Sequence, residues 1–176
     1  MARSCFKRIK PGTNVNFHLR IILIVLLGVM ATAEQWPFQA YPAVVSKHKP
    51  VSLKLETPRA KQYIPVIRKA VRHGPNFAGH YTVANWGCGT ECAAFVIVDD
   101  STGRVYEPPE IARGVDLGLG DTEPVYRVDS SLMVLASCPD PKVYGLKNCR
   151  RNFYRWDGRK LILLSSEPVT AAPSGH

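Results

Sequence analysis

The sequence predicts one α+β domain, in which an N-terminal helix packs on a twisted antiparallel β-meander of about six or seven strands held by two disulfides. Apolar side chains recur at helical spacing within residues 57–73. After Gly74 the pattern changes to short segments of period two separated by turn-forming residues. Four cysteines follow the leader, an even number that is typical of a disulfide framework in an exported protein.

Residues 1–33 have the pattern of a secretory signal peptide. A basic lead without acidic residues precedes the apolar stretch 21–30, which ends in the A-x-A site at Ala31–Ala33. Ten apolar residues fall short of the roughly 20 needed to span a bilayer. We therefore expect a periplasmic or secreted protein, cleaved near Ala33 and without stable membrane insertion afterwards.

The basicity of the chain is concentrated in this leader. It holds five of the 23 Lys and Arg residues and none of the 14 acidic ones, so the remainder has 18 − 14, or +4. Such a charge is ordinary for solubility and predicts no nucleic-acid partner. The remaining 143 residues (176 − 33) suffice for one domain with its own core.

The first part of the mature chain predicts a lead-in followed by the helix. Residues 34–56 are rich in proline and read as extended, with one short edge strand at 51–55. Thr57 and Pro58 form an N-cap and a first helical position, and Pro65 should kink the helix or delay its start. The domain is expected to cover 57–166, with a disordered tail at 167–176.

Alternating apolar residues predict strands, with tight turns at 99–103 and 157–158 and a long loop at 108–124. Residues 93–98 and 161–164 are apolar at odd and even positions, so both segments should be covered on both faces. The expected strands are 80–86, 93–99, 104–107, 126–129, 132–137, 152–156 and 160–165.

The four mature cysteines are Cys88, Cys92, Cys138 and Cys149, and four cysteines allow three pairings. We favour Cys88 with Cys92 and Cys138 with Cys149, because each pair closes a short loop between strand-like segments. A redox pair at C-x-x-x-C, or a thiolate zinc site with His80, is the alternative. Export favours oxidised cysteines, so no metal site and no cofactor is predicted.

His80, Glu91 and Asp99 are the candidate catalytic residues. A histidine beside a glycine at a strand start could act as a general base if folding brings a carboxylate to orient it. A structural, hydrogen-bonded histidine is the alternative interpretation. The sequence contains no G-x-S-x-G, H-E-x-x-H, P-loop or dinucleotide-binding signature.

Arginines alternate with aromatic residues in the run 144–156, a composition typical of interfaces. Arg151, Arg155 and Trp156, together with Trp86, are the candidate binding residues. The same run also fits a plain strand with a basic outer face over an aromatic core.

Five short motifs resemble those of a family of small secreted bacterial proteins of unassigned function. They are GPNFAGHY from Gly74, WGCG-x-x-C from Trp86, V-D-x-x-T-G-x-V-Y from Val98, R-x-D-S from Arg127 and W-D-G from Trp156. The resemblance covers roughly residues 60–164 and implies bacterial export and a helix followed by an antiparallel sheet. It implies no catalytic residue, and the Cys138 and Cys149 pair rests on this sequence alone.

The leading functional interpretation is a non-enzymatic exported binding protein, of inhibitor or immunity type, whose partner is an envelope protein. Small size, expected disulfides and the missing reaction signatures favour it. The alternative is a small hydrolase or metal-dependent enzyme, which requires His80, Glu91 and Asp99 to converge in one pocket. A structural envelope component that docks through Arg151 and Arg155 is a third interpretation.

Overall fold

The structure is a computed structural model that describes residues 36–46, 51–89, 91–114, 123–138 and 148–169. The predicted signal peptide lies outside these residues. The chain divides into two units after Trp36, and the described helices and strands all belong to the second unit, from Pro37 onward. Within the described residues, no helix is long and apolar enough to cross a membrane.

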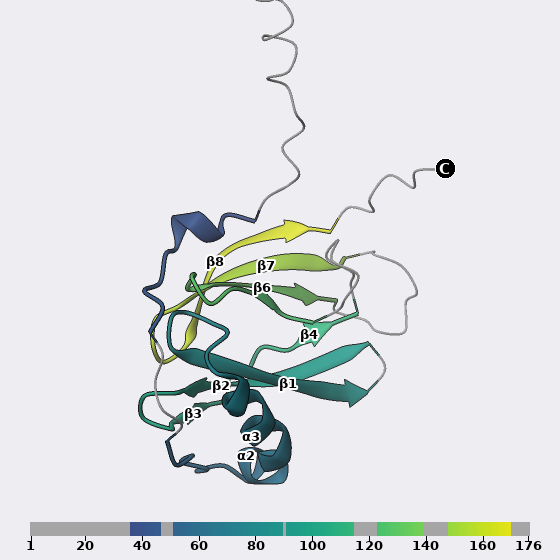
Figure 1. The fold of residues 1–176 in the computed structure, drawn as a ribbon. Coiled ribbons are helices and arrows are strands. Elements are labelled where there is room, and N and C mark those ends of the chain that lie inside the picture. Colours follow the sequence, from purple (N-terminus) through teal and green to yellow (C-terminus); the bar gives the residue numbers. More distant parts are fainter. Residues whose placement is uncertain (1–35, 47–50, 90, 115–122, 139–147, 170–176) are drawn as a thin grey trace, which may run out of the picture. The chain divides into compact units, whose positions relative to one another are not determined.

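Eight strands and three short helical segments make up the described part of the fold (Figure 1). The helical segments are η1 (Phe38–Ala40), α2 (Pro58–Gln62) and α3 (Ile64–His73). The strands are β1 (Tyr81–Gly89), β2 (Cys92–Asp99), β3 (Val105–Tyr106), β4 (Ala112–Arg113), β5 (Val125–Tyr126), β6 (Leu132–Ser137), β7 (Arg150–Trp156) and β8 (Leu161–Pro168).

The class is mostly β, which corrects the α+β expectation. The strands form two antiparallel sheets of four strands each: β1-β2-β3 with β4 also paired to β2, and β5-β6-β7-β8. The expectation of a single N-terminal helix packed on one meander is therefore wrong. The meander is interrupted after β3: this two-residue strand pairs with β2, whereas β5 pairs with β6 in the second sheet. The antiparallel pairing and the two disulfides are confirmed.

The helical region is broken into two short helices at Tyr63. The expected cap is present, since the Thr57 hydroxyl accepts a hydrogen bond from Ala60 N at 3.1 Å and Pro58 follows it. The break follows from Pro65, which has no N–H to continue the hydrogen-bond ladder of α2. Pro65 instead lies in the first turn of α3, where that N–H is not needed.

Strand β2 is covered on both faces, as expected from its apolar run. Val96 and Val98 pack beneath the helices with Ile67, and all three are 0% exposed. The opposite face, with Phe95 and Ile97, packs against the second sheet. In Figure 1 the helices lie on one side of the first sheet and β6, β7 and β8 on the other.

The expectation that residues 161–164 are covered on both faces is wrong. Leu163 is 54% exposed and Leu164 is 40% exposed. Strand β8 is the edge of the second sheet and pairs only with β7 among the described strands. A β-bulge interrupts this pairing between Phe153 and Tyr154.

All seven expected strands are present with ends shifted by up to three residues, and β4 lies inside the expected long loop. The expected strand at 51–55 is reduced to a single bridge between Lys54 and Arg104. The expectation of a disordered tail is wrong for residues 167–169. Strand β8 continues to Pro168, and the Val169 N–H donates to the Cys149 carbonyl at 3.0 Å. Residues 170–176 lie outside the described part.

The GPNFAGHY motif forms a tight turn that joins three segments. Gly79 N donates to the Val128 carbonyl at 2.7 Å, and the Gly79 carbonyl accepts from Ser46 N at 3.1 Å. The Asn76 amide pairs with both backbone groups of Val83, at 2.7 and 3.1 Å. The turn therefore ties the lead-in and the β5–β6 connection to the start of β1.

The space between the two sheets is filled with aromatic rings at one end. The Trp156 ring lies 5.3 Å from Tyr106, 5.5 Å from Tyr81 and 6.4 Å from Phe77, measured between ring centroids. At the other end the first sheet contributes small residues, with Ala93 paired to Ala112. A cavity lies at this end.

Candidate functional site

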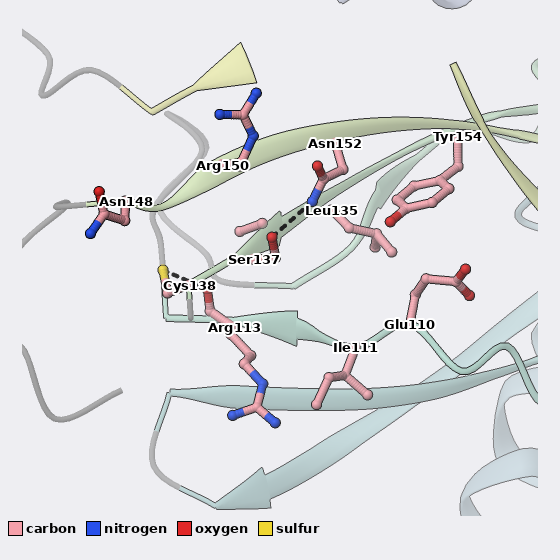
Figure 2. A pocket seen from close by; sticks show the side chains of 11 residues that line it. Glu110, Ile111, Arg113, Leu135, Ser137, Cys138, Asn148, Arg150, Asn152 and Tyr154 are labelled. Carbon is pink, nitrogen blue, oxygen red and sulfur yellow. Dashed lines mark hydrogen bonds between the residues drawn. The ribbon is translucent and has the colours of Figure 1, made fainter. Parts of the chain in front are cut away.

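A cavity of about 350 Å³ lies between β4 and the inner face of β6 and β7 (Figure 2). Two cross-strand pairs line it, Leu135 with Asn152 and Ser137 with Arg150. The loop residue Glu110 and strand β4 border it opposite these pairs. Its volume is at the lower end of the range for small-molecule sites in proteins.

Strand alternation places the polar lining residues. Side chains two apart in a strand point to the same face, so Arg150, Asn152 and Tyr154 share the face of the buried Trp156. Trp156 is expected in the core or at an interface, and alternation from it assigns Tyr154, Asn152 and Arg150 to the same face. That signal was available and would have found the cavity residues of β7.

Three charged residues line the cavity, Glu110, Arg113 and Arg150, and Glu110 and Arg150 lie at opposite ends of it. Figure 2 shows Glu110 beside Tyr154 at one end, and Asn148 and Arg150 at the other. Glu110 Oε2 is buried and accepts no hydrogen bond from any residue that the structure describes. The ion pairs found within the described residues, His80–Asp99 and Arg127–Asp129, do not include Glu110.

The pKa of Tyr154 is raised in this environment. Burial raises the pKa of its hydroxyl, and the negative charge of Glu110 raises it further. Both causes keep the phenol neutral at physiological pH. A phenol and a carboxylate side by side offer a hydrogen-bond donor and several acceptors.

A hydrogen-bond network orders the lining between the charged ends. Asn152 is 8% exposed; its amide donates to Ser137 Oγ at 2.9 Å, and its carbonyl accepts from Ser166 Oγ at 2.6 Å. Arg150 donates to Ser166 Oγ and to the Ser166 carbonyl, both at 2.6 Å. These contacts fix the rotamers of Asn152 and Arg150 before any ligand binds.

Both predicted disulfides are present, Cys88–Cys92 and Cys138–Cys149, and each lies near the cavity end of its sheet. The Cys138 sulfur lines the cavity 3.5 Å from the Arg113 carbonyl oxygen, and Arg113 pairs with Cys92 in the first sheet. Because the sulfurs of Cys88 and Cys92 are joined, and His80 lies at the far end of β1, the alternative thiolate and histidine zinc set is not assembled. Among the described residues, no group of three or more metal-binding side chains occurs.

The three candidate catalytic residues do not converge. His80 Nε2 lies 3.8 Å from Asp99 Oδ1, where β1 begins and β2 ends. Glu91 lies at the opposite end of β2, beside the disulfide, and eight residues of strand separate the two carboxylates by about 26 Å. The condition for the hydrolase interpretation is therefore not met.

Asp99 orders the turn between β2 and β3. Its carboxylate accepts hydrogen bonds from the backbone and hydroxyl groups of both Ser101 and Thr102, at 2.5 to 3.3 Å. Burial raises the pKa of Asp99, but these hydrogen bonds and the nearby His80 lower it by more, so it lies below the ordinary value of 3.8. The ionised form is thus the one that the fold stabilises.

Replacing Asp99 with asparagine is expected to lower the free energy of unfolding at neutral pH by about 1.5–3 kcal/mol, the range for hydrogen bonds to a charged group. Because the pKa of Asp99 is lower in the folded state, its carboxylate stabilises the fold fully above pH 3.8, the ordinary pKa. This stabilisation is lost as the pH falls through the lower pKa of the folded state. Urea unfolding between about pH 2 and 5 should therefore show a shallower pH dependence in the variant.

Two other aspartates with a lowered pKa, Asp129 and Asp157, keep part of this dependence in the variant. Glu167→Gln, on the exposed end of β8, is the control and should leave both stability and pH dependence close to wild type. An unchanged acid profile in Asp99→Asn would contradict the role given to this carboxylate.

The four candidate binding residues do not share one surface. Trp156 is 5% exposed and lies between the sheets. Trp86 stacks on Tyr63 of the helical layer, with ring centroids 4.2 Å apart. Arg151 and Arg155 belong to the other face of β7, which they share with the buried Phe153, whereas Arg150 lies on the face of Trp156.

Comparison with known proteins adds no assignment: no family model, no curated protein and no solved structure matches this chain. The residues of the quoted motifs have structural roles in this fold. Ser130 Oγ donates to the lead-in carbonyls of Phe38 and Tyr41, and Asp157 accepts from two backbone N–H groups of its turn. The cavity between the sheets is therefore the feature of this structure that points to a function.

Proposed function

We propose that the protein is an exported, non-enzymatic binding protein that receives a ligand, or a group of a partner protein, in the cavity between its sheets. The observation that carries the proposal is the buried Glu110 carboxylate oxygen, which lines this cavity and accepts no hydrogen bond from a described residue. A buried polar atom without a partner costs free energy. A bound group that donates to it would remove this cost.

Export is supported by the leader in residues 1–33 and by the pairing of all four cysteines that follow it. Disulfides form and persist in oxidising compartments such as the periplasm. A pre-ordered cavity lining also favours binding, because little side-chain freedom is lost when the ligand enters.

An envelope protein is the partner class that suits an inhibitor or immunity-type binder. The tip of the β1–β2 hairpin favours this form, since Gly87 and Gly89 are exposed and the Cys88–Cys92 disulfide closes the loop between the strands. A loop constrained in this way loses little entropy when it docks into a cleft. The hairpin tip and the cavity lie at the same end of the first sheet.

The test is native mass spectrometry of the protein recovered from the periplasm. Wild type should carry a non-covalent ligand or a co-isolated protein, and Ser137→Phe should lose it, because a phenyl ring at this position occupies the cavity. Ser165→Phe, on the exposed face of β8, is the matched control and should keep it.

Two results would overturn the proposal. One is wild-type protein without any bound species when it is recovered from the periplasm. The other is a bound species that Ser137→Phe retains while its thermal unfolding shows the variant to be folded. Recovery of the chain from the cytoplasm with its leader intact would separately contradict export.

A further inference from the structure

We propose that the cavity binds a short zwitterionic peptide of two to four residues, with the terminal ammonium on Glu110 and the terminal carboxylate on Arg150. This inference rests on the proposed binding function and names the class of ligand. It starts from the separation of unlike charges that Figure 2 shows. The two groups would attract each other if they were free to meet, and the fold keeps them apart.

The Glu110 end suits a primary ammonium. The carboxylate supplies a negative charge, and its Oε2 is buried with acceptor capacity left over. Tyr154 lies beside it with a partly buried ring and hydroxyl. An ammonium group donates three hydrogen bonds and is attracted to the face of an aromatic ring. Carboxylate and tyrosine together therefore match the amino terminus of a peptide.

The Arg150 end suits a carboxylate. Ser166 accepts hydrogen bonds from Nε and Nη2 of this guanidinium, which orients it, and among the described residues no acceptor for Nη1 is found. Asn148 lies at the same end. Arginine is the side chain that recognises carboxylates with fixed geometry. An anionic terminus at this rim would meet a cation that is already held in place.

The spacing of the two ends sets the length of the ligand. Arg150 and Tyr154 are four residues apart on β7, or about 13 Å along the strand. An extended peptide advances about 3.3–3.6 Å per residue, so the termini of a tripeptide are roughly 10 Å apart. A free amino acid cannot reach both ends at once. Leu135, between the two ends, offers the apolar surface over which such a peptide would lie.

The experiment is calorimetric titration of the disulfide-bonded wild-type protein with trialanine, N-acetyl-trialanine and trialanine amide. Trialanine should bind, and blocking either terminus should weaken binding about tenfold, the effect of losing one charge-assisted hydrogen bond. Glu110→Gln should bind trialanine and N-acetyl-trialanine equally well, and it should still discriminate against the amide. Thermal unfolding of Glu110→Gln checks that the variant is folded.

Failure to bind trialanine at millimolar concentration would overturn the inference, as would a change of less than about twofold on blocking either terminus. These outcomes are distinct from failure of the proposed function. If native mass spectrometry shows a species that Ser137→Phe loses while wild type ignores the peptides, the binding function stands and the ligand class is wrong.

Discussion

Replacing Gly79 with alanine is expected to lower the free energy of unfolding by about 2–6 kcal/mol, the sum of about 1–3 kcal/mol of backbone strain and about 1–3 kcal/mol of overpacking. Gly79 has φ +86°, and an added Cβ would collide with the backbone carbonyl of Val44. Neither the new Cβ nor the Val44 carbonyl can rotate away, because the position of each is set by the backbone. Urea unfolding followed by tryptophan fluorescence measures the loss.

Gly74→Ala is the matched control, because Gly74 has the same φ of +86° but nothing within 4 Å of an added Cβ. It should show the strain alone, about 1–3 kcal/mol. Gly87→Ala, without a positive φ and with open space around it, should stay close to wild type. Equal losses in Gly79→Ala and Gly74→Ala would show that the lead-in yields to the new methyl group.

Local features of this fold were predictable because they depend on neighbouring residues. The Thr57 cap, the turn at Asp99 and the pairing of Cys88 with Cys92 each arise within a few positions of chain. Even the break in the helix was signalled by Pro65. The strand positions followed from alternation for the same reason.

The two-sheet arrangement could not be predicted in this way, because it depends on which distant strands meet. Alternation within β3 and β5 does not say that the meander ends between them. Nor does an apolar run such as 161–164 show whether its strand lies at the edge of a sheet, which is why Leu163 was expected to be covered and is exposed. The convergence of His80, Glu91 and Asp99 that the hydrolase alternative requires is absent, because Glu91 and Asp99 lie at opposite ends of β2.

The cavity was missed because its charged residues come from separate parts of the chain. Glu110 lies in the expected loop, and Arg150 lies in a run interpreted as a basic outer face. Alternation from the buried Trp156 places Arg150 and Arg151 on opposite faces of β7, but only the fold shows that the face of Arg150 borders a cavity.

Replacing Phe77 with alanine is expected to cost about 3–5 kcal/mol, the usual range for deleting a buried phenyl ring. Phe77 is 0% exposed and contacts Tyr126 and Trp156, with ring centroids 5.9 and 6.4 Å away. Its loss would leave a void at the aromatic end of the space between the sheets. Urea unfolding should show a lower midpoint with an unchanged slope.

Leu163→Ala is the control for this prediction, since Leu163 is 54% exposed and should change stability by no more than about 0.5 kcal/mol. Phe77→Leu keeps part of the volume and should lie between the two, which provides a measurable variant even where Phe77→Ala does not fold. A loss below about 1 kcal/mol in Phe77→Ala would mean that the aromatic rings collapse into the void. The F of GPNFAGHY would then serve the turn rather than the contact between the sheets.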